Sequence, residues 1–205
     1  GYTVLGAIEC MCGNTKLMIE NHERARRIAP NDAFVLSNYA SSLAISWMFN
    51  EQCDLLNEMI EKRIDYAESL AKLTFNRSVL GDYETAYLMS RRYLDEISNP
   101  DPDVLRKMTL NVKIFEFIKS KALDMHEVET YASIMNKLLI DENLLLTFLH
   151  EWLTPENTLV RDIVVEADDD KITELNDRLI DELVGFEFSD TFLSNFSGSF
   201  IPNEM

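Results

Sequence analysis

The chain has 205 residues with a formal net charge of −17, and 46% of its residues are hydrophobic. This hydrophobic fraction is sufficient for a buried core, and the low counts of Gly and Pro, six and five, argue against a turn-rich β-sandwich. The negative charge disfavours nucleic acid as a partner, because phosphate backbones bind chiefly to Lys and Arg, and no apolar run approaches the roughly twenty residues that cross a bilayer.

Helices are predicted along most of the chain. Proline cannot continue a helix and also restricts the residue before it, so Pro30 and Pro155 mark clear boundaries. Glycine and short polar residues supply the other interruptions. The predicted breaks fall near Gly13, Pro30, Asn50, Gly81, Asn99 to Pro102, Asp124, Asp141 and Thr154 to Pro155.

An interval of 34 residues relates positions in the first half of the chain. Gly13 recurs as Gly81, two intervals later, and Trp47 stands at the position between them. An interval of this length is typical of helix–turn–helix units that stack into a superhelix. The first half is therefore interpreted as a helical repeat protein.

Two segments resemble the tetratricopeptide (TPR) repeat family. The sequence GDYETA from Gly81 to Ala86 resembles the turn and the start of the second helix, and ARRIAPND from Ala25 to Asp32 resembles the end of a preceding repeat. The resemblance implies an all-α, antiparallel helical-hairpin solenoid followed by a C-terminal helical appendage. The implied divisions are a solenoid at 1–154, with repeats at about 1–32, 33–66 and 67–100 and a degenerate unit at 101–154, and an appendage at 155–205.

The same resemblance implies which positions are buried and which face a binding groove. Repeat starts at Ala33 and Ala67 align Leu36 with Leu70, Tyr39 with Leu73 and Ala40 with Thr74, at positions where the family packs its helices together. The first helix of each TPR repeat lines the concave side, which is predicted to hold an extended or helical peptide through apolar contacts. The groove residues implied here are Phe34, Ser37, Asn38, Ser41, Ile45, Lys72, Phe75 and Val79.

Two segments after Pro155 have distinct patterns. Residues 158–165, TLVRDIVV, are rich in β-branched side chains and form either one short strand or a helix of poor propensity. Asp168 and its two acidic neighbours precede an amphipathic stripe of Ile172, Leu175, Leu179 and Leu183. Acidic residues in that place cap a helix and favour its positive end, so a helix start is predicted there and a metal site is not.

The C-terminal tail repeats phenylalanine every four residues. The four rings belong to Phe188, Phe192, Phe196 and Phe200, in a segment otherwise rich in Ser, Asn, Gly and Asp. This spacing predicts that the rings share one face of a helix. Two roles remain open: the tail either packs as a cap or core element of the solenoid, or acts as a docking tail that enters a groove.

No pattern typical of catalysis or metal binding is found. His126 and His150 each precede a Glu, as in a zinc-protease helix, but the required second His does not follow. Cys10 and Cys12 point to different sides of a helix and Cys53 is distant in sequence, so all three are interpreted as buried small residues in a reducing compartment. We therefore predict no enzyme activity, no cofactor and no metal.

These observations favour a non-enzymatic, cytoplasmic protein-binding module of the adaptor or chaperone-like kind. Its groove would hold a peptide segment of a protein partner, and the acidic surface favours a basic or amphipathic one. A homodimer is also expected, because solenoid ends and aromatic surfaces tend to self-associate. The alternative is a regulatory or sensor region of a larger transcriptional or signalling protein, with further sequence upstream of Gly1.

Overall fold

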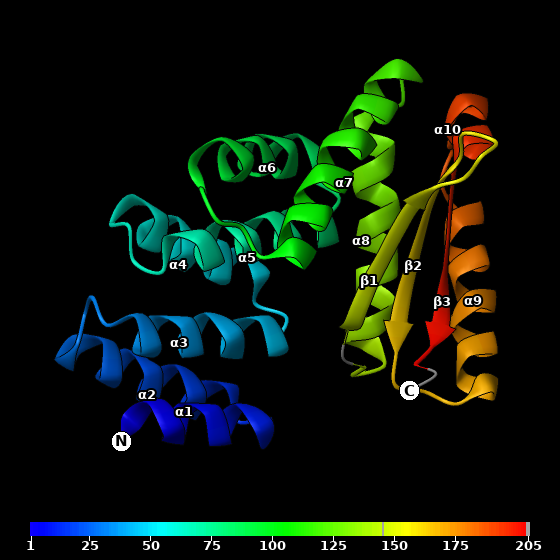
Figure 1. Ribbon diagram of the computed structural model, residues 1–205. Coiled ribbons are helices and arrows are strands. Elements are labelled where there is room, and N and C mark those ends of the chain that lie inside the picture. Colours follow the sequence, from blue (N-terminus) through cyan, green and yellow to red (C-terminus); the bar gives the residue numbers. More distant parts are fainter. Residues whose placement is uncertain (145, 204–205) are drawn as a thin grey trace.

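The computed structural model describes residues 1–144 and 146–203 and is mostly helical, which confirms the helical prediction (Figure 1). A small sheet of three strands lies in the C-terminal part of the chain. The described elements are α1 (Tyr2–Met11), α2 (Thr15–Ile28), α3 (Ala33–Ile45), α4 (Phe49–Glu61), α5 (Tyr66–Val79), α6 (Tyr83–Glu96), α7 (Pro102–Ser120), α8 (Met125–Asp141), β1 (Leu146–Leu153), β2 (Leu159–Val165), α9 (Asp169–Val184), α10 (Asp190–Asn195) and β3 (Phe196–Pro202).

The first six helices form three consecutive pairs whose internal turns have the same backbone structure. Gly13, Trp47 and Gly81, spaced 34 residues apart, have φ angles of 74°, 57° and 79°. In each turn the N–H of this residue donates to the carbonyl three positions earlier, and the next N–H donates to the carbonyl five positions earlier. These two bonds satisfy the last carbonyls of the first helix. The predicted break near Asn50 therefore lies at Trp47, which adopts the conformation that glycine has in the other two turns.

Helices α1 to α7 form a helical body, and the aligned positions are buried between its helices. Leu36, Leu70, Ala40 and Thr74 are completely buried, and Tyr39 and Leu73 are nearly so. Because residues spaced three and four apart share one face of a helix, the 36–40 and 70–74 segments each present a continuous face to the core. The predicted burial of these six positions is confirmed.

Helix α8 packs directly on the turn between α5 and α6. A Cβ atom added at Gly81 would lie 2.9 Å from the Cβ of Ala132 and 3.0 Å from the Cα of Glu129. The side-chain amide of Asn136 donates to the carbonyl of Val79 over 2.9 Å at the end of α5. Gly81 thus permits both the turn and the close approach of α8.

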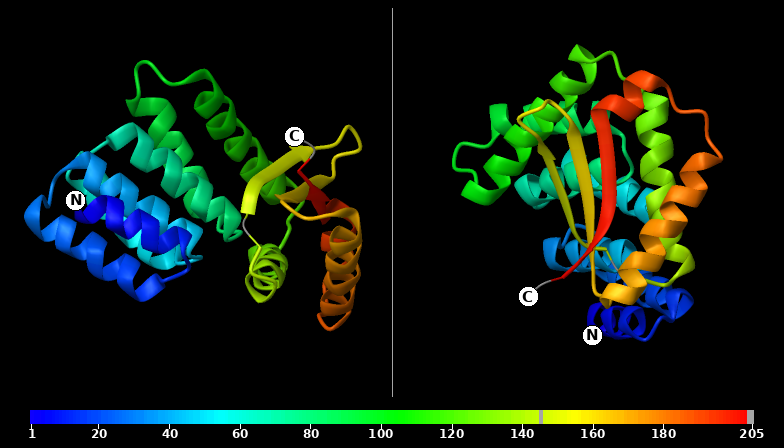
Figure 2. Two further views of the ribbon diagram at one scale, coloured as in Figure 1. Left: turned by 90° about the horizontal axis from the view of Figure 1, so that it is seen from below. Right: turned by 90° about the vertical axis from the view of Figure 1, so that its right-hand side faces the viewer.

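The C-terminal part contains the sheet, in the order β1-β2-β3. Strand β1 pairs antiparallel with β2, while β2 pairs parallel with β3 through a connection that includes α9 and α10. Helices α8 and α9 lie together on one face of the sheet (Figure 2). The β-branched segment is therefore a strand, and its partners are two segments that the sequence pattern predicted as helical.

The sheet corrects three expectations about this region. Residues 146–153 form β1 and not the end of a helix, because the hairpin with β2 satisfies their backbone groups. Pro155 lies in the hairpin turn, so the change from helices to sheet precedes β1 and does not fall at residue 155. The appendage, of which the last two residues lie outside the described part, is a mixed helix and sheet unit. The predicted cap of α9 is confirmed, since Asp168 accepts from the N–H of Lys171 over 2.9 Å.

The phenylalanine tail does not form one helical face. Phe188 precedes α10, Phe192 lies in α10, and Phe196 and Phe200 lie in β3. Phe192 stacks between Phe188 and Phe196, and its ring centroid lies 4.8 Å from each of theirs. Phe192, Phe196 and Phe200 are buried in the core formed with α8 and α9, and the partly buried Phe188 packs against it. Because a strand turns alternate side chains to one face, residues four apart in β3 still share a face.

None of the helices in the described part of the chain combines the length and apolar content of a membrane-crossing segment. Cys10 and Cys53 are buried, as predicted, whereas Cys12 is exposed at the end of α1. Cys10 lies against the neighbouring helix, where its thiol donates to the Ser42 carbonyl over 3.4 Å. The interpretation of the cysteines as buried side chains therefore holds for two of the three.

Candidate functional site

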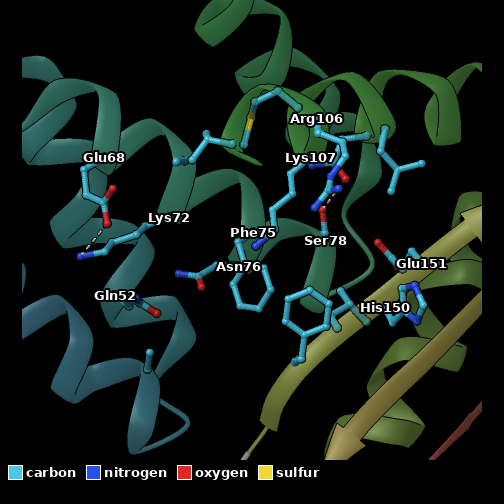
Figure 3. Close-up of a pocket in the computed structure, with 18 of the residues that line it drawn as sticks. Gln52, Glu68, Lys72, Phe75, Asn76, Ser78, Arg106, Lys107, His150 and Glu151 are labelled. Carbon is cyan, nitrogen blue, oxygen red and sulfur yellow. Dashed lines mark hydrogen bonds and ion pairs between the residues drawn. The ribbon is translucent and has the colours of Figure 1, made fainter. Parts of the chain in front are cut away.

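A groove of about 800 Å³ lies between the helical body and the edge of the sheet (Figure 3). Helices α3, α5 and α7 supply most of its lining, with one residue from α4, and β1 supplies the rest. Its volume is within the range of about 300–1,000 Å³ that is typical of ligand sites in proteins. The lining residues are Ser41, Ala44, Ile45, Gln52, Glu68, Ala71, Lys72, Phe75, Asn76, Ser78, Val104, Arg106, Lys107, Met108, Leu110, Asn111, Phe148, Leu149, His150 and Glu151.

Helical periodicity explains why α5 and α7 both line this groove. On α5, Glu68, Lys72 and Phe75 follow one another at spacings of four and three and therefore share a face. On α7, Val104 and Lys107 are related in the same way. The floor and walls are largely apolar, and charged groups occur at a few places along them.

Two buried side-chain amides line the groove with atoms that have no hydrogen-bond partner among the described residues. These atoms are the Nδ2 donor of Asn76 and the Oε1 acceptor of Gln52. Both atoms are inaccessible to solvent, so each represents a cost of about 1–3 kcal/mol within the fold and not a group exposed to a ligand.

The charges on the groove walls differ from those of the whole chain. Lys72, Arg106 and Lys107 are cationic, and Glu68 is the carboxylate that pairs with Lys72 over 3.4 Å. Arg106 pairs with Asp103 over 3.2 Å, but both side chains are strongly exposed and such pairs contribute little. The Lys107 ammonium lies 5.0 Å from the centroid of the Phe148 ring. The accessible wall is therefore locally positive in a chain of net charge −17.

Glu151 also lines the groove, but its carboxylate belongs to a buried network behind the wall. Arg161 donates to it over 2.7 Å, and the hydroxyl of Tyr83 donates to the same oxygen. Burial raises the pKa of Glu151, while both donors favour its ionised form. Burial and the neighbouring carboxylate raise the pKa of Tyr83 well above its ordinary value. The Glu151 charge is thus compensated by Arg161 and does not offset the cations of the groove.

Four of the eight predicted groove residues line this groove, namely Ser41, Ile45, Lys72 and Phe75. The other four do not. Phe34 projects at the start of α3 with 65% of its surface exposed, and Val79 is completely buried below the α5–α6 turn. The remaining two, Ser37 and Asn38, bond to Asp65 and to the Phe34 carbonyl respectively.

The part of the groove formed by α7 and β1 was not predicted from the sequence. Arg106 and Lys107 lie on α7, which was predicted as part of a degenerate unit, and Phe148 and His150 lie on β1, which was predicted as helix. Alternating residues Phe148, His150 and Trp152 form an aromatic row, with the last two rings 4.6 Å apart. That alternation was the available signal for a strand.

The tail residues predicted as a docking ligand lie away from the groove. None of the four phenylalanines belongs to its lining. Across the described residues, no group of three or more His, Cys, Asp or Glu side chains is placed to hold a metal ion. No known family model, no curated protein and no solved structure matches this chain.

Proposed function

We propose that this chain is a protein-binding module that holds a peptide segment of a partner in the groove between α5, α7 and β1. The observation that carries the proposal is the apolar groove itself, lined on opposite elements by the rings of Phe75 and Phe148. Peptide-recognition grooves combine apolar pockets for side chains with polar groups for the backbone. An adaptor or chaperone-like role follows from such a groove.

The helical body is proposed to be TPR-like. The support is the repetition of the same turn, with the same pair of backbone hydrogen bonds, at 34-residue intervals around Gly13, Trp47 and Gly81. In this proposal the superhelical concave side and β1 together enclose the ligand. The addition of β1 distinguishes the groove from one built by helices alone.

Selection from a random twelve-residue peptide display library tests this function. The expected result is a set of peptides that bind the wild-type chain and bind F75A or F148A at least about tenfold more weakly, since truncating an aromatic anchor at an interface costs about 2 kcal/mol or more. F34A is the matched control, because Phe34 lies outside the groove and should leave affinity unchanged. Two aromatic variants are used so that a folding defect in one does not decide the test.

Absence of any peptide whose binding depends on Phe75 and Phe148 would overturn the proposal, provided that circular dichroism shows both variants folded. A second candidate function, sensing of a small ligand by a regulatory protein, is favoured by the groove volume alone. Native mass spectrometry of the purified chain would reveal such a ligand as added mass that is lost in F75A.

A further inference from the structure

The two edges of the sheet, β3 and β1, differ in the hydrogen bonds made to their backbone groups. At the β3 edge, the side-chain amide of Asn176 pairs with both backbone groups of Phe200, accepting from its N–H over 2.8 Å and donating to its carbonyl over 2.9 Å. The Tyr131 hydroxyl donates to the Gly198 carbonyl over 2.9 Å. These contacts block the β3 edge, as proteins commonly do to prevent unwanted strand pairing.

Within the part of the chain that the structure describes, the β1 edge has no such hydrogen bonds, although α7 packs beside part of the strand. Among the described residues, its backbone N–H and carbonyl groups have no hydrogen-bond partner outside the hairpin with β2. Residues 148–151 of this same strand line the groove. The middle of this strand edge therefore borders the candidate site, where it can pair with an extended chain.

The side chains around the open edge specify the chemistry of that chain. Phe148 on β1 and Phe75 on α5 provide apolar surface, and Lys72, Arg106 and Lys107 provide positive charge. The chain as a whole carries a large excess of carboxylates, which disfavours the binding of acidic ligands at surfaces without clustered cations. Complementary charge steers encounter and selects the partner, and repulsion elsewhere sharpens the selection.

The geometry points to an extended peptide segment with both acidic and apolar side chains, which adds to the sheet as a fourth strand beside β1. This inference rests on the proposed peptide-binding function and names its ligand. Lys72 and Phe75 share one face of α5, and the Lys107 ammonium lies 5.0 Å from the centroid of the Phe148 ring. The apolar and acidic side chains of the peptide must therefore lie close together. The net charge of the whole chain favoured a basic or amphipathic partner, whereas the cationic side chains that line the groove favour an acidic one.

Charge reversal on one helix tests the ligand chemistry. K107E should weaken the selected peptides by about threefold or more at low ionic strength, with a smaller effect in 1 M salt, because exposed charges are screened. K113E is the matched control: it makes the same charge change on α7 at an exposed position that does not line the groove. The peptides selected should be enriched in Asp and Glu together with Val, Ile or Phe.

Amide hydrogen exchange tests the binding mode with the tightest of these peptides. Alternate amides within residues 147–152, those that face away from β2, should slow at least tenfold in the complex, because pairing removes them from water. Methylation of every second backbone nitrogen of the peptide should abolish binding, while methylation of the other set should be tolerated.

The outcomes separate the inference from the function on which it rests. Peptides that depend on Phe75 and Phe148 but are basic, or that bind without protecting β1 amides, would overturn the added acidic strand and leave the groove function intact. A selection that yields no peptide dependent on these two rings would overturn both.

Discussion

Arg161 on β2 and Glu151 on β1 form a fully buried ion pair, with 2.7 Å between the guanidinium Nη1 and the carboxylate Oε1. The same guanidinium donates to the carbonyls of Ser78 and Val79, over 2.8 and 2.7 Å, at the end of α5. One side chain therefore joins both strands of the hairpin to the helical body. The position of β1 beside the groove depends on this connection.

Replacing Arg161 with Met should lower the free energy of unfolding by about 3–5 kcal/mol, because it leaves the Glu151 charge buried without a partner. Urea denaturation at pH 7 measures the change. The double variant R161M/E151L should recover part of the loss, since the buried charge is then removed as well. Equal stability of the single and double variants would contradict this account of the pair.

Replacing Gly81 with Ala should destabilise the chain more than the same change at Gly13. Both residues have positive φ, which costs an alanine about 1–2 kcal/mol. Only at Gly81 would the new Cβ also contact α8, at 2.9 Å from Ala132, which adds about 1–3 kcal/mol of overpacking. Around Gly13 there is nothing within 4 Å of that atom. Thermal and urea unfolding of G81A and G13A should therefore give clearly different losses.

Replacing Phe192 with Ala should cost about 3–5 kcal/mol, because its ring is completely buried among other aromatic side chains. The neighbouring Leu193 is 62% exposed, and L193A should change stability by no more than about 0.5 kcal/mol. Guanidinium unfolding curves of the two variants provide the comparison. A tail that acts as a detachable ligand would instead leave F192A as stable as the wild type.

His22 should make the chain less stable in mild acid. Burial lowers its pKa below the ordinary value of 6.5, so the folded state keeps the ring neutral. The stabilising contribution is complete above pH 6.5 and decreases as the pH falls below that value, because the unfolded chain then binds the extra proton. Its Nε2 lies 2.9 Å from the Ser42 hydroxyl oxygen.

The comparison of wild type with H22Q isolates this effect from the titration of the many carboxylates. Urea midpoints measured from pH 7.5 to 5 should decline more steeply for the wild type than for H22Q. Parallel curves for the two chains would show that His22 does not contribute to the pH dependence.

Features that depend on residues close together in the chain could be predicted from the amino-acid sequence. The 34-residue interval of Gly13, Trp47 and Gly81 predicted repeated helix pairs, although the middle break was expected near Asn50, and each turn is closed by hydrogen bonds that span at most five residues. Asp168 predicted the start of α9 for the same reason, since a cap acts within one turn of helix. The burial of aligned positions such as Leu36 and Leu70 was implied by the resemblance to the TPR family, and it follows a helical spacing that is itself local.

The sheet and the groove depend on contacts between segments that are far apart in the chain. Residues 146–153 become a strand because β2 satisfies their backbone groups, and the tail becomes β3 because the far side of β2 accepts it. Phe75 and Phe148 stand 73 positions apart in the chain and line one site because the hairpin packs against the helices, where Arg161 also donates to the Val79 carbonyl of α5. Such contacts depend on the three-dimensional path of the chain, which cannot be predicted from short patterns of neighbouring residues.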